Sequence, residues 1–157
     1  MACLSFSCSK SQNLNNLSLN EFYNNISFNG ISLSQIIDTH SDLGNIQTLF
    51  SNPVLRTRDD NTTKSLSYKV DGYYFRFEEL SSSNKDTDYS IAYIWVEDGA
   101  KVKIKDVCIG VGDNISKLGN VIILEPGDIA FYNEDTNASI DIFYENNIIT
   151  KISFVFD

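Results

Sequence analysis

Residues 66–79 read Leu-Ser-Tyr-Lys-Val-Asp-Gly-Tyr-Tyr-Phe-Arg-Phe-Glu-Glu, and this stretch is the strongest indication of the fold class. Apolar and polar residues alternate over Leu66–Val70, and Tyr73–Glu79 is rich in aromatic residues. Both patterns are typical of β-strands. Between them lies Asp71-Gly72, a dipeptide that favours a tight hairpin turn because it tolerates positive φ at both central positions. The stretch therefore predicts an antiparallel β-hairpin.

Further strands are predicted along the rest of the chain from β-branched, aromatic and alternating segments. They are Ile91–Val96, Val102–Lys105, Cys108–Val111, Val121–Leu124, Asp128–Tyr132, Ala138–Tyr144 and Ile148–Phe156. Lysines at 101, 103 and 105 alternate with Val102 and Ile104, so that strand has one wet and one buried face. We expect it at a sheet edge, where lysines discourage pairing with a second chain, and we expect a monomer.

Short helices are predicted at Leu17–Tyr23, Ile31–Ile37, Leu43–Phe50 and 113–118, where apolar residues recur at helical spacing or capping residues stand at the start. Ser32 or Ser34 and Ser41 or Asp42 are the expected N-caps of the second and third. The predicted class is thus α+β, with short helices packed on an antiparallel sheet. A flexible or signal- and tether-like segment, residues 1–25, precedes a single domain at 26–157.

Two helix-plus-sheet units, 26–98 and 99–157, can be matched within that domain. The run Ile109-Gly110-Val111-Gly112-Asp113-Asn114-Ile115-Ser116-Lys117-Leu118-Gly119 opens the second, and Asn29–Ile36 opens the first less closely. This opening resembles the β-lactamase-inhibitor-protein fold and the small outer-membrane assembly lipoproteins of the SmpA/OmlA type. The resemblance implies tandem repeats and a bacterial inhibitor or envelope protein. A generic α+β domain without that ancestry is the alternative.

The N-terminus carries a second resemblance. Phe6-Ser7-Cys8-Ser9-Lys10 is similar to the cleavage end of a bacterial lipoprotein signal, in which the cysteine is lipidated. The resemblance implies a lipid anchor at Cys8 and a location in the periplasm or at the outer membrane. However, the basic start and apolar stretch of a signal peptide do not precede it, and a cytoplasmic protein with a frayed start is the alternative.

Composition narrows the function classes. The chain has 157 residues, and 12 Lys and Arg against 21 Asp and Glu give a net charge of −9. Such a charge repels phosphate backbones, which argues against nucleic acid as a partner. The single histidine, His40, and Cys108 are the candidate catalytic groups, but no motif surrounds either. Cys108 is expected to be a buried small hydrophobe. We expect no cofactor, no metal and no enzymatic activity.

A contact surface remains as the functional prediction. Aromatic residues crowd the first predicted sheet beside acidic residues, and exposed Tyr and Trp are typical of binding hot spots. The expected function is a non-enzymatic immunity or inhibitor protein that neutralises a basic toxin or enzyme; a structural envelope lipoprotein is the alternative. The predicted partner-binding residues are Tyr73, Glu78, Glu79, Asp86, Asp88, Tyr93, Trp95, Glu97 and Asp98.

Overall fold

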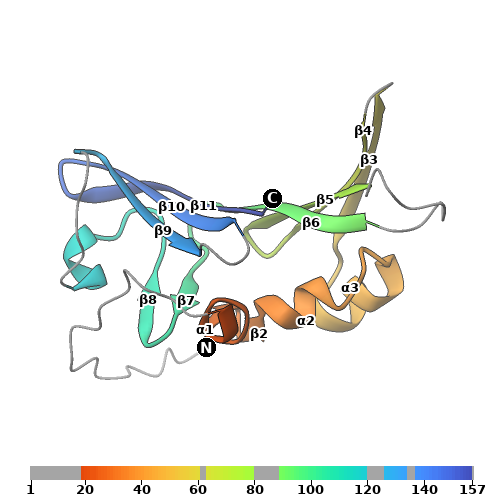
Figure 1. The fold of residues 1–157 in the computed structure, drawn as a ribbon, viewed down its shortest axis with the longest axis horizontal. Helices are drawn as coiled ribbons and strands as arrows, with labels where there is room; N and C mark the ends of the chain where they lie inside the picture. Colours follow the sequence, from red (N-terminus) through yellow and green to blue (C-terminus); the bar gives the residue numbers. More distant parts are fainter. Residues whose placement is uncertain (1–18, 61–62, 80–88, 120–125, 134–136, 157) are drawn as a thin grey trace.

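The computed structural model describes residues 19–60, 63–79, 89–119, 126–133 and 137–156. Within them a seven-stranded antiparallel sheet, the large sheet, has the order β3-β4-β5-β6-β11-β10-β9 (Figure 1). Its strands in chain order are β3 (Val54–Asp60), β4 (Thr63–Val70), β5 (Tyr73–Glu79), β6 (Tyr89–Val96), β9 (Asp128–Asn133), β10 (Ala138–Glu145) and β11 (Ile148–Val155). The mostly antiparallel strand content with few short helices confirms the α+β class.

A second layer covers one face of the large sheet (Figure 1). It contains a four-stranded antiparallel sheet, the small sheet, of order β2-β1-β7-β8. The helices lie in the same layer, so the opposite face of the large sheet, the outer face, carries no helix in the described part of the chain. The elements of this layer are α1 (Leu19–Asn24), β1 (Ile26–Phe28), β2 (Ile31–Ser32), α2 (Leu33–Ile37), α3 (Leu43–Leu49), β7 (Val102–Ile104), β8 (Val107–Ile109) and the 3₁₀-helix η1 (Ile115–Leu118).

Local sequence explains most of these boundaries. Asp71 and Gly72 both have positive φ, as the predicted turn between β4 and β5 requires. Ser32 caps α2 in a capping box with Gln35, and Asp42 caps α3 by accepting a hydrogen bond from the Asn45 N–H at 2.9 Å. Asn114 caps η1 in the same way.

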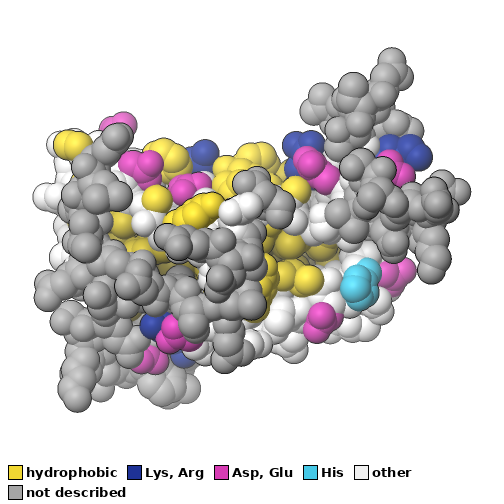
Figure 2. All heavy atoms as spheres, viewed as in Figure 1, with side chains coloured by type: hydrophobic (Ala, Val, Ile, Leu, Met, Phe, Trp, Pro, Cys, Tyr) yellow, Lys and Arg dark blue, Asp and Glu magenta, His cyan; other side chains and the backbone are white. Residues whose placement is uncertain are grey.

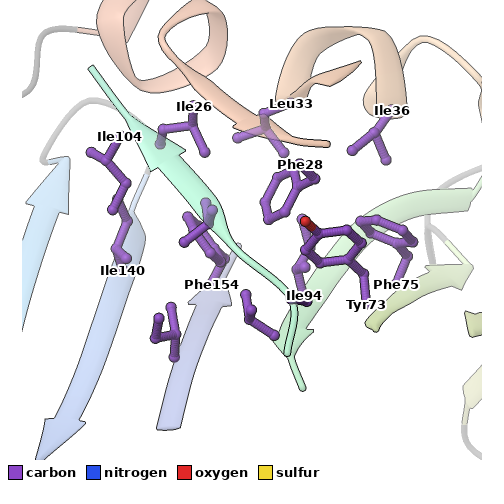
Figure 3. Close-up of a cluster of buried hydrophobic side chains, with 14 of the residues drawn as sticks. Ile26, Phe28, Leu33, Ile36, Tyr73, Phe75, Ile94, Ile104, Ile140 and Phe154 are labelled. Carbon is purple, nitrogen blue, oxygen red and sulfur yellow. The ribbon is translucent and has the colours of Figure 1, made fainter. Parts of the chain in front are cut away.

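The hydrophobic core fills the space between the two layers. Phe28 of β1 stands at its centre, with its ring edge-on to Tyr73 at 5.3 Å, to Phe75 at 5.8 Å and to Phe154 at 5.2 Å between centroids. Figure 3 shows Leu33 and other side chains of the second layer pointing toward these rings. The core thus joins the small sheet to the middle of the large sheet.

Each sheet contains strands from both halves of the chain. In the large sheet the meander β3–β6 meets the hairpins of β9–β11 where β6 pairs with β11, with Tyr93 opposite Val155 and Val96 opposite Ile152. In the small sheet the β1–β2 hairpin meets the β7–β8 hairpin where β1 pairs with β7. The two halves therefore share both sheets and one core.

Several expectations need correction. The strand Val102–Ile104 is not at an edge, because β7 lies between β1 and β8. Cys108 is exposed, since Val107 and Ile109 take the buried side of β8. Part of the expected tether-like segment is structured, because α1 begins at Leu19 and Phe22 is fully buried. The sequence reading missed β1, β2 and β3. Residues 1–18 with Cys8, and the strand expected at 121–124, lie outside the described residues.

Candidate protein-binding face

An aromatic cluster lies on the outer face of the large sheet. Side chains alternate along β5 and β6, so Tyr73 and Ile94 point into the core while Tyr74, Tyr93 and Trp95 point outward. The Trp95 ring lies 4.7 Å from the Tyr74 ring and 4.4 Å from the Tyr93 ring between centroids. All three are partly buried by one another and by neighbours. In the view of Figure 2, hydrophobic side chains appear along the top of the molecule, next to basic and acidic ones.

Ion pairs border the aromatic cluster. Glu78 pairs with Arg76 at 2.8 Å, and Glu97 with Lys69 at 2.7 Å. These pairs join side chains that remain about a third to a half exposed, where an ion pair contributes only ~0–1 kcal/mol and rearranges readily. The acidic rim that the sequence suggested is therefore mixed in sign on this side of the face.

Carboxylates lie on the other side of the cluster. Trp95 is opposite Ser153 of β11, Ser153 is opposite Asp141 of β10, and Asp128 of β9 is one diagonal step further. The Ser139 hydroxyl donates a hydrogen bond to Asp141 Oδ2 at 3.3 Å. Burial, together with the nearby Asp128 charge, raises the pKa of Asp141 above its usual range.

Within the part of the chain that the structure describes, three buried polar atoms on the outer face have no hydrogen-bond partner: Arg76 Nε, Asp128 Oδ1 and Ser153 Oγ. Ser153 is only 1% exposed. A buried polar atom without a partner costs ~1–3 kcal/mol, so such groups are uncommon and usually have a reason. Ser153 is opposite Trp95 and Arg76 is opposite Tyr93, so two of these groups border the aromatic cluster and mark this face as the candidate site.

The predicted binding residues divide into separate places. Tyr93 and Trp95 lie in the aromatic cluster, and Glu78 and Glu97 at its border. Asp98 is exposed in the turn after β6, and Glu79 pairs with Lys64 at 3.7 Å. Asp86 and Asp88 lie outside the described residues.

Tyr73 does not lie on the surface, so its prediction as a binding residue is wrong. Its side chain is fully buried, and its hydroxyl donates a hydrogen bond to the Lys101 carbonyl at 2.5 Å. The phase of the β5 alternation decides this: Tyr73 shares its face with Phe75 and Phe77, while Tyr74 takes the outer face.

The sequence reading did not single out Tyr74, Asp128, Asp141 or Ser153 as binding residues. The alternation of Asp141 with Ile140 and Ile142 in β10 was a usable signal for an outward carboxylate. The neighbouring strands gave no such signal, because the pairing of β6 with β11 joins residues far apart in the chain.

The candidate catalytic groups are not brought together. His40 is exposed after α2 (Figure 2), whereas Cys108 is on β8 of the small sheet. His40 borders a recess of about 540 Å³ whose other walls include Tyr23, Ile37 and Phe156. Among the described residues, no hydrogen bond joins His40 to Asp38, Ser41 or Asp42, as a catalytic relay would need.

No family model, curated protein or solved structure matches this chain. Over the described ranges, no helix is long and apolar enough to span a bilayer. In the same part of the chain, no three His, Cys, Asp or Glu side chains gather as a metal site would require.

Proposed function

We propose that this protein is a non-enzymatic binding module, an immunity or inhibitor protein that neutralises a protein partner through the outer face of the large sheet. One observation carries the proposal: the Tyr74–Trp95–Tyr93 cluster lies on a sheet face that no described helix covers. Tyr and Trp side chains in such positions supply most of the binding energy in many interfaces. The net charge of −9 favours a basic partner, since complementary charge speeds encounter.

Tandem repeat ancestry is part of the same proposal. The meeting of β6 with β11, and of β1 with β7, is what two similar units related by an approximate two-fold axis would produce. Each hairpin of the small sheet also leads into a capped helix, at Ser32 and at Asn114. These features support an inhibitor-protein-like origin for the fold.

The test is capture of a partner from the source cells with a C-terminally tagged full chain, followed by mass spectrometry. Wild type is compared with Trp95→Ala and with Cys108→Ser, an exposed change on the small sheet. We expect a stoichiometric basic protein with wild type and Cys108→Ser, reduced at least ten-fold with Trp95→Ala. Circular dichroism checks that each variant is folded.

Two outcomes contradict the proposal. Equal capture by Trp95→Ala would remove the outer face from binding. Absence of any stable partner, together with an acylated Cys8 in the same spectra, would favour the alternative of an envelope lipoprotein.

A further inference from the structure

The outer face continues from the aromatic cluster into a short row of polar side chains. The pairing registers place Tyr74, Trp95, Ser153 and Asp141 side by side on β5, β6, β11 and β10. Adjacent strands are ~4.8 Å apart, so the backbones of Trp95 and Asp141 are separated by about two strand spacings, roughly 10 Å. One extended side chain can therefore contact the indole ring and the carboxylate together.

We infer that this row, with Asp128, receives an arginine or lysine side chain of the protein partner. The inference deepens the proposed function and rests on it, because the same face is used. We call Trp95, Asp128, Asp141 and Ser153 the cation socket.

The socket is polar but incompletely satisfied in the free chain. Ser153 Oγ and Asp128 Oδ1 are buried without a hydrogen-bond partner, although both lie on the face that a partner would approach. A guanidinium group has five N–H donors in a planar fork, and an ammonium group has three. Either supplies the donors that these oxygen atoms lack.

The charge of the socket is compensated only in part, because the Lys151 charge opposes the rise in the Asp141 pKa but does not cancel it. Lys151 is the nearest cationic side chain on β11, but its ammonium lies over the Phe143 ring, 5.0 Å from the centroid. Among the described residues, no ion pair joins Lys151 to Asp128 or Asp141. An incoming cation would relieve the repulsion between the two carboxylates, which contributes to the raised pKa of Asp141.

The aromatic side favours an organic cation over a metal ion. A calcium ion requires six to eight oxygen ligands, and the described residues hold no cluster of three or more metal-binding side chains. Arginine in contrast stacks on aromatic faces and binds carboxylates with two parallel hydrogen bonds. A row with an indole ring at one end and two carboxylates at the other is thus suited to arginine first and lysine second.

Fluorescence titration tests the socket directly, because Trp95 is the only tryptophan in the chain. Terminally blocked tri-arginine, tri-lysine and tri-glutamate peptides are titrated into the full chain, and calcium chloride is titrated separately. The test variant is Asp128→Asn with Asp141→Asn. The matched control, Asp38→Asn with Asp71→Asn, removes the same charge at exposed positions away from the outer face.

We expect a saturable change in Trp95 emission with tri-arginine, a weaker one with tri-lysine and none with tri-glutamate. The test variant should bind tri-arginine at least ten-fold more weakly than wild type, and the control within two-fold of wild type. Equal binding by the test variant, equal weakening in the control, or no saturable change overturns the inference. The same change with calcium chloride overturns it in favour of a metal site. Where the double variant fails to fold, Asp141→Asn alone replaces it.

Partner capture separates this inference from the proposed function. Loss of the partner with Trp95→Ala and with the test variant supports both. Loss with Trp95→Ala but full capture by the test variant overturns the cation socket and leaves the binding face intact. Full capture by Trp95→Ala and by the test variant overturns the cation socket and the proposed function together.

Discussion

Phe28 offers the most decisive test of how the two layers are held together. Its side chain is fully buried, and it contacts rings of β5 and β11 in three edge-on pairs. Replacing a buried Phe by Ala costs ~3–5 kcal/mol, from lost burial and from the cavity that remains. Each aromatic pair adds ~0.5–1.5 kcal/mol beyond the area term, so we expect Phe28→Ala to reach at least the middle of that range, about 4 kcal/mol.

Urea denaturation followed by circular dichroism measures this loss. With a slope of ~2 kcal/mol per molar urea, a loss of about 4 kcal/mol lowers the unfolding midpoint by ~2 M. The control is Phe143→Ala on the outer face, where the ring is only partly buried beside Lys151. We expect it to cost under ~1.5 kcal/mol, because less apolar surface is removed from contact. A loss below ~1 kcal/mol for Phe28→Ala, or equal losses for both variants, would refute the account of the core.

The remaining predictions concern the segment before η1. Asp113 accepts hydrogen bonds from Lys101 at 2.8 Å, from Lys117 at 2.7 Å and from the Gly110 N–H. Burial raises the pKa of the Asp113 carboxyl, but these three bonds lower it by more, so the pKa lies below its usual value. A lowered pKa stabilises the fold above the unfolded pKa of ~3.9 and ceases to do so as the pH falls through the folded value. Asp113→Asn should therefore lower the free energy of unfolding by about 1 kcal/mol at pH 7, a loss limited by solvent screening because the lysines are half exposed. In urea titrations the difference from wild type should shrink below about pH 4. A difference that does not change with pH would contradict this prediction. A Cβ on Gly110 would overlap the Ala100 carbonyl oxygen and lie 2.8 Å from Lys101 Cδ. Gly110→Ala should therefore lower the free energy of unfolding by at least ~2 kcal/mol, measured by thermal unfolding. The control Gly30→Ala has no atom within 4 Å of the added Cβ and should show only the smaller penalty of its positive φ.

Local features were predictable because their causes are local. The turn at Asp71-Gly72 and the caps at Ser32 and Asp42 depend on residues at most three positions apart. The short strands β1 and β2 escaped prediction for the opposite reason. Their few residues carry too little alternation to be recognised, and their pairing with each other and with β7 stabilises them.

The presence of an aromatic cluster on the surface was predictable, but the residues that form it were not. Aromatic density in β5 and β6 indicated an exposed ring cluster, yet the sequence did not show which phase of the alternation faces the core. The structure places Tyr73 inside and Tyr74 outside. The carboxylates of the cation socket come from β9 and β10, which reach Trp95 only through β11.

The sequence alone is enough to predict the α+β class, most strands of the large sheet, the helix caps and the scarcity of catalytic motifs. These follow from residue type and spacing within a few positions of the chain. Tertiary structure alone decided that both halves share two sheets, that β7 is interior, and that Trp95 lies in one row with Ser153 and Asp141. The physical reason is that antiparallel pairing between β6 and β11 joins residues some sixty positions apart, and no local preference encodes which strands become neighbours.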